Sequence, residues 1–121
     1  MKRISESLDI ALKEFIGTTC YYKLNENLLI TEGIYFLVTE CNAYWLIYLA
    51  FNHLVRLNFS VTFVVIKIRL ISSGYELSIK NGEGRNLSRQ KLFLLDATFL
   101  DLEIYGNKEA KIWFLILPSE Y

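Results

Sequence analysis

The 121-residue sequence contains one proline, six glycines and one histidine. Proline and glycine concentrate in the linkers that separate domains, so their scarcity excludes a long linker anywhere in the chain. The sequence also has no visible internal repeat or low-complexity segment, and its length is close to the commonest size of one domain. We therefore expect residues 1–121 to fold as a single domain.

Long apolar runs are missing as well. A helix that spans a membrane needs about 20 consecutive apolar residues, whereas the most apolar segment, NAYWLIYLAFNH at residues 42–53, is shorter and has polar ends. Residues 59–71 are interrupted by Lys67 and Arg69. The opening residues, MKRISESLDI, are charged where a secretory leader would begin its apolar region. We expect a cytoplasmic protein that does not contact a membrane, with both cysteines reduced.

An excess of charge of one sign is also absent, because 13 basic and 13 acidic residues cancel. Arg85, Arg89 and Lys91 lie close together in the sequence and could form a local basic patch. Without a net positive field, however, nucleic acid is not expected as a partner.

Motifs that carry catalysis or bind cofactors are not found. The sequence has no Walker loop, GxGxxG or GxSxG motif, and Cys20, Cys41 and His53 lack the paired spacing of zinc ligands. We interpret His53 as a partly buried side chain that bonds a backbone group near the end of a helix. The sequence therefore indicates no catalytic residue, no metal and no cofactor, which argues against an enzyme.

The first half of the chain shows apolar residues at helical spacing. Helices are predicted over 5–16, 31–41 and 43–55, with short strands over 20–24 and 28–31. Residues 34–39 also favour a strand by propensity. We choose the helix because apolar residues recur there at helical intervals and because Thr31 followed by Glu32 is typical of a helix start.

From Phe59 onward the apolar period is two. Strands are predicted over 59–71, 75–80, 87–95, 100–105 and 111–117. The segments between them, including GNKEA at 106–110, have turn compositions, so successive strands should be antiparallel neighbours. The predicted fold class is α+β with two layers: an antiparallel meander of about five strands, and two to three helices packed on its apolar face.

Five short motifs occur along the chain: FIGT at 15–18, YY at 21–22, TEG at 31–33, AYWLI at 43–47 and LPSEY at 117–121. In this order and spacing the chain resembles an uncharacterised family of small bacterial and phage- or plasmid-borne proteins, a domain of unknown function. The resemblance implies a bacterial, cytoplasmic setting compatible with a mobile element, and it brings no activity, cofactor or substrate. It also implies an Asp in relatives where this chain has Tyr48, so acid chemistry on this helix is not expected here.

Tyrosine and tryptophan are abundant in the first half, and their apolar rings with polar tips suit protein interfaces. We therefore hypothesise a small non-enzymatic interaction module that binds a protein partner or forms a homodimer through exposed aromatics or a sheet edge. The alternative is a small ligand-binding or catalytic domain that takes a small molecule. Its pocket would be lined by Thr18, Tyr22, Thr31, Glu32, Tyr44, Trp45, Glu120 and Tyr121.

Overall fold

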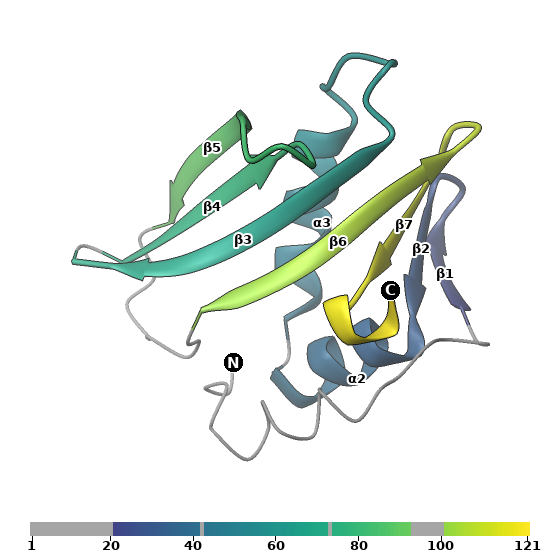
Figure 1. The fold of residues 1–121 in the computed structure, drawn as a ribbon. Helices are drawn as coiled ribbons and strands as arrows, with labels where there is room; N and C mark the ends of the chain where they lie inside the picture. The colour runs from purple at the N-terminus through teal and green to yellow at the C-terminus, as the bar shows by residue number, and fades with distance from the viewer. Residues whose placement is uncertain (1–20, 42, 73, 93–100) are drawn as a thin grey trace.

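The computed structural model describes residues 21–41, 43–72, 74–92 and 101–121. These residues form seven strands, two α-helices and a short 3₁₀ turn, η1 (Figure 1). In chain order they are β1 (Tyr21–Asn25), β2 (Leu28–Thr31), α2 (Glu32–Cys41), α3 (Tyr44–Leu54), β3 (Phe63–Ile71), β4 (Gly74–Lys80), β5 (Asn86–Leu92), β6 (Leu102–Glu109), β7 (Ile112–Ile116) and η1 (Pro118–Glu120). The helix predicted over 5–16 lies outside the described residues. The other two predicted helices are confirmed to within one residue at each end.

All seven strands form one sheet, in the order β1-β2-β7-β6-β3-β4-β5. β3, β4 and β5 are successive antiparallel neighbours, as predicted, but the chain then returns to place β6 on the other side of β3. β2 pairs in parallel with β7, so the sheet is mixed. The predicted antiparallel meander of about five strands is therefore only partly correct, because the sheet has seven strands and is mixed. β2 and β7 are far apart in the sequence, and a local alternating pattern does not specify pairing at such a distance.

The two helices cover one face of the sheet, and Figure 1 shows α3 running behind the strands. Val64, Ile66 and Ile68 alternate along β3 and are buried in one hydrophobic cluster with Leu46 and Ile47 of α3. Burying each such side chain contributes about 1.5–3 kcal/mol to folding. The α+β class, with helices packed on the apolar face of the sheet, is confirmed.

The predicted turn at 106–110 is wrong, because β6 extends to Glu109 and the chain turns only at Ala110 and the residue after it. Gly106 lies inside the strand. A Cβ atom at this position would lie 2.8 Å from Cγ2 of Val64 on the neighbouring strand, so close packing requires a glycine. Gly106 is therefore needed for packing between strands, although in the sequence alone it is typical of a turn.

Ala110 adopts a φ of 57°, in the left-handed region that costs a residue with a Cβ about 1–2 kcal/mol. Glycine relieves this strain but makes the unfolded chain more flexible, so Ala110→Gly should raise the free energy of unfolding by about 0.5–1 kcal/mol. Urea denaturation followed by circular dichroism measures the change. Lys111→Gly is the control, because its φ is not positive, and it should lower stability. An equal gain from both variants would contradict the explanation.

Candidate functional site

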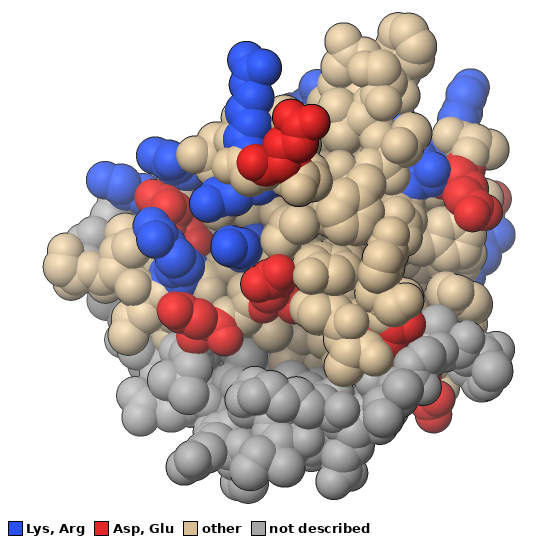
Figure 2. Space-filling model, in the orientation of Figure 1, with Lys and Arg blue, Asp and Glu red and all other residues tan. Residues whose placement is uncertain are grey.

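The face of the sheet opposite the helices, here called the open face, carries no α-helix in the described part of the chain. Figure 1 views this face from the front, with η1 lying across one end of it. Because side chains alternate along each strand, the residues between the buried ones point to this face. Figure 2 shows the same view, in which charged side chains gather over β3, β4 and β5 and uncharged ones cover much of the rest.

The charged part of the open face is of mixed sign. Nη2 of Arg69 lies 3.1 Å from Oε1 of Glu76, and Nε of Arg89 lies 3.9 Å from the same oxygen. Lys67 stands beside Glu103 in the register of β3 and β6. Both arginine side chains are more than half exposed, and pairs of this kind contribute about 0–1 kcal/mol each. Their carboxylates interrupt the basic surface along these strands.

Aromatic rings form two groups on the rest of the open face. Tyr21 of β1 and Phe114 of β7 meet edge to face, with ring centroids 5.5 Å apart. Phe63, Tyr105 and Tyr121 contact one another at centroid distances between 5.3 and 5.7 Å. Such ring pairs contribute about 0.5–1.5 kcal/mol beyond their buried area. We call these five residues the aromatic surface.

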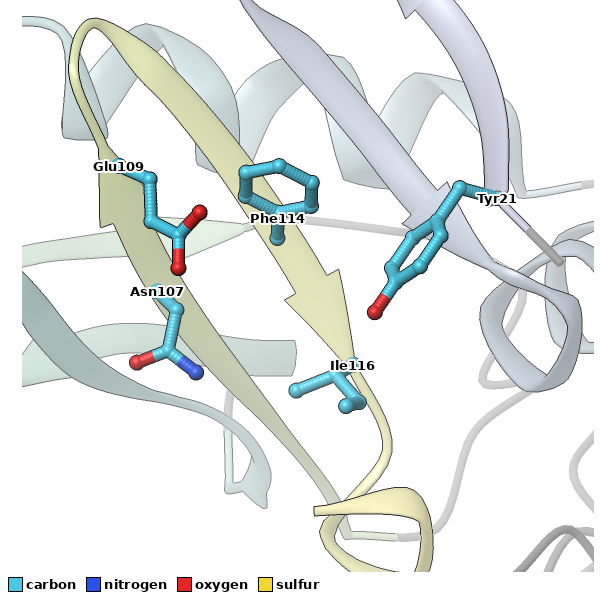
Figure 3. Close-up of a pocket in the computed structure, with 5 residues that line it drawn as sticks. All are labelled: Tyr21, Asn107, Glu109, Phe114 and Ile116. Carbon is cyan, nitrogen blue, oxygen red and sulfur yellow. The ribbon is translucent and has the colours of Figure 1, made fainter. Parts of the chain in front are cut away.

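A hollow of about 300 Å³ lies in the aromatic surface. Figure 3 shows its five lining residues, which come from three strands: Asn107 and Glu109 from β6, Phe114 and Ile116 from β7, and Tyr21 from β1. Asn107 stands directly opposite Phe114 in the sheet register. The rings and Ile116 supply apolar surface, while a carboxylate, an amide and a phenolic hydroxyl supply polar groups. A hollow with this lining suits a ligand that is partly apolar and also forms hydrogen bonds.

A second feature, the buried carboxylate of Glu120, joins η1 to α2. Its Oε1 accepts hydrogen bonds from the Thr31 hydroxyl at 2.6 Å and from the Leu117 N–H at 3.1 Å. Its Oε2 accepts one from the Gly33 N–H at 3.1 Å. The position at the start of α2 is also one where the helix dipole favours a negative charge. We call Thr31, Gly33, Leu117 and Glu120 the Glu120 lock. It brings the TEG and LPSEY motifs together and directs the following residue, Tyr121, onto the open face.

Two of the residues predicted to line a pocket, Thr31 and Glu120, thus meet in this lock. Thr18 lies outside the described residues. Tyr22 stacks on a tyrosine of α2 with ring centroids 4.1 Å apart, and the exposed Glu32 lies in the first turn of α2. Tyr44 and Trp45 belong to α3, which lies on the covered face of the sheet. Tyr22, Glu32, Tyr44 and Trp45 do not line the hollow.

The residues that line the hollow were not among those predicted. Phe114 and Ile116 are two positions apart in the predicted strand over 111–117, so the alternation of that strand already places them on one face. Asn107 and Glu109 lie in a segment that its composition assigned to a turn. Their common projection to one face becomes visible only when this segment is recognised as a strand.

Polar contacts tie α3 to both edge strands of the sheet. Nδ1 of His53 lies 2.5 Å from Oγ of Ser88 on β5, and its Nε2 lies 2.6 Å from Oε1 of Gln90 on the same strand. The partners of His53 are therefore side chains, whereas the sequence predicted a backbone group. At the other edge, the hydroxyl of Tyr48 donates to the carbonyl oxygen of Leu24 on β1 at 3.5 Å, and Tyr48 remains 39% exposed. These contacts explain His53 and Tyr48 by the attachment of α3 to the sheet.

The model of a protein family of unknown function, DUF6876, matches residues 6–121. The chain belongs to this family. The match confirms the predicted resemblance to an uncharacterised domain and covers nearly the whole sequence. No curated protein and no solved structure matches the chain.

Two further observations concern only residues 21–41, 43–72, 74–92 and 101–121. No helix within these ranges is long and apolar enough to cross a membrane. No three potential metal ligands among His, Cys, Asp and Glu side chains come together within them.

Proposed function

We propose that this chain is a small non-enzymatic interaction module that binds a protein partner, or a second copy of itself, through the aromatic surface. The observation that carries the proposal is the exposure of ordered rings: Tyr21 and Tyr121 are 48% and 68% exposed although neighbouring rings hold them in place. Rings that are already ordered lose little conformational entropy on binding and bury a large area. For these reasons tyrosine is frequent among the residues that dominate interface energies.

The alternative, a ligand-binding or catalytic domain, has less support. The side chains of Thr31 and Glu120 form a hydrogen bond with each other, so their polar atoms are less available to bind a ligand. Tyr44 and Trp45 lie on the covered side of the sheet, whereas Tyr121 lies on the open face. A ligand that touched all of these side chains would have to reach both faces of the sheet.

Site-specific photocrosslinking in cells of the native host tests the proposed function. With p-benzoylphenylalanine in place of Tyr121, which is exposed in the aromatic surface and does not line the hollow, irradiation should give one discrete cross-linked species. The same replacement at Asn52, which is exposed on α3, is the matched control and should not give that species. Adding Tyr21→Ala should reduce the yield about tenfold, the effect of losing a contact worth about 1.4 kcal/mol.

A covalent dimer of the chain, or a cross-link to another protein, would support the proposed function and identify the partner. Equal yields from positions 121 and 52, no cross-linked species at position 121, or a yield that Tyr21→Ala leaves unchanged would contradict it. A circular dichroism spectrum of Tyr21→Ala checks that the variant is folded, as expected for an exposed residue of an edge strand.

A further inference from the structure

The hollow carries a negative charge that no described residue neutralises. The side chain of Glu109 forms no ion pair or hydrogen bond with another described residue. Lys23 of β1 lies 3.3 Å from Glu26, and Nζ of Lys108 donates to a backbone carbonyl at 2.9 Å and lies over the ring of Trp113. These two lysines are therefore engaged away from the hollow.

A carboxylate beside aromatic rings matches the chemistry of a guanidinium group. Glu109 can accept two parallel N–H bonds from such a group, and the faces of aromatic rings attract its planar cation. The side-chain oxygen of Asn107 is a further acceptor within the same hollow. A lysine ammonium is a compact point charge. It fits the two oxygens of the carboxylate and the plane of an aromatic ring less well than the planar guanidinium group does.

The size of the hollow is also informative. A volume of about 300 Å³ is at the lower end of the range of about 300–1,000 Å³ found for small-molecule sites. A single long side chain fills such a volume, whereas a large cofactor does not. The hollow is open to solvent on the open face, which suits a side chain presented by another protein.

We propose that the hollow binds an arginine side chain presented by the partner protein. In this assignment Glu109 pairs with the guanidinium group, Phe114 and Tyr21 contact its plane, and Asn107 accepts one of its remaining N–H groups. This inference rests on the proposed function and names the chemistry of the partner. Arginine buried against an aromatic ring is also a frequent anchor of protein interfaces.

Nuclear magnetic resonance titration of the full ¹⁵N-labelled chain tests the assignment with three capped tripeptides of the form Gly-X-Gly. With arginine at the central position we expect a Kd of about 1 mM, a reasonable strength for one side chain, and shifts of the backbone amides of β6 and β7 around the hollow. Citrulline has nearly the same shape without the charge and should bind at least about tenfold more weakly, because the pair with the carboxylate is lost. Lysine should bind several-fold more weakly than arginine.

Two variants localise the effect. Glu109→Gln should weaken the arginine peptide about tenfold, to the level of the citrulline peptide. Glu103→Gln, on the same strand and the same face but outside the hollow, is the matched control and should leave binding unchanged. Equal binding of the arginine and citrulline peptides, equal binding of arginine and lysine, or an unchanged Kd in Glu109→Gln would overturn the assignment.

The photocrosslink at position 121, outside the hollow, separates this assignment from the proposed function. If the arginine peptide does not bind the parent chain while the cross-linked species still forms, in the parent chain and in Glu109→Gln alike, the arginine assignment fails and the interaction module stands. If the arginine peptide binds at the hollow but no cross-linked species forms in cells, the assignment of the hollow stands and the proposed function fails.

Discussion

Replacing Glu120 with glutamine should lower the free energy of unfolding by about 3 kcal/mol. All three contacts of this carboxylate are with donors, namely the Thr31 hydroxyl and the N–H groups of Gly33 and Leu117. A glutamine side chain has one acceptor oxygen and one NH₂ group, so in either orientation its NH₂ faces at least one of these donors. The variant loses a hydrogen bond to a charged group, worth about 1.5–3 kcal/mol, and leaves a buried donor unpaired, at a further cost of about 1–3 kcal/mol.

Urea denaturation monitored by circular dichroism measures this loss, and an unchanged slope with urea shows that stability itself has changed. Glu83→Gln is the matched control, because Glu83 is exposed in the turn between β4 and β5 and its carboxylate has no partner among the described residues. We expect the control to stay within about 0.5 kcal/mol of the parent chain. If both variants unfold at the same urea concentration, the Glu120 lock does not stabilise the fold.

Features that depend on local pattern could be predicted from the sequence. α2 follows from apolar residues at helical spacing and from Thr31, whose hydroxyl accepts a hydrogen bond from the Ile34 N–H at 3.3 Å and so caps the helix. The apolar face of β4 follows from the alternation of Tyr75, Leu77 and Ile79, which are all fully buried. Both patterns extend over only a few residues, and the packing of the whole chain agrees with them.

Features that depend on distant pairing could not be predicted in the same way. Leu28 of β2 stands beside Trp113 of β7, and no periodicity within either strand indicates this partner. Gly106 contributed to the wrong prediction of a turn over 106–110. The sequence alone does not distinguish a glycine required by a neighbouring side chain from a glycine required by a turn. Because of that error Asn107 and Glu109 were not assigned to a strand, and the hollow that they line was not predicted.

The motifs of the sequence indicated important residues but not their role. TEG and LPSEY singled out Thr31 and Glu120, which were predicted to line a pocket for a ligand. In the structure these side chains bond each other, and each satisfies a polar group that would otherwise be buried without a partner. A short motif therefore marks positions that require particular side chains. Only the geometry shows that Thr31 and Glu120 are required for the hydrogen bonds that hold the fold together.

Replacing Gly33 with alanine should also destabilise the fold, by about 2 kcal/mol, although alanine is normally the better helix residue. In an ordinary helix position the change from glycine to alanine gains about 1 kcal/mol. At Gly33, however, the new Cβ would lie 2.5 Å from Oε1 of Glu120 and 2.6 Å from Cδ1 of Leu117. The Glu120 carboxylate must move, and the loss of its hydrogen bonds, about 3 kcal/mol, outweighs the gain in helix propensity.

A double-mutant cycle distinguishes this explanation from a general intolerance of position 33. In a Glu120→Ala background the carboxylate is absent and only the terminal methyl group of Leu117 has to move, so adding Gly33→Ala should stabilise the fold by up to about 1 kcal/mol, which corresponds to a coupling energy of up to about 3 kcal/mol. Gly82→Ala is the matched control, since its new Cβ would come no closer than 3.5 Å to Phe63, an ordinary contact distance, and it should not couple to Glu120. If Gly33→Ala costs the same with and without Glu120, the backbone at this position and not the lock requires glycine, and the TEG motif then reflects the start of α2 alone.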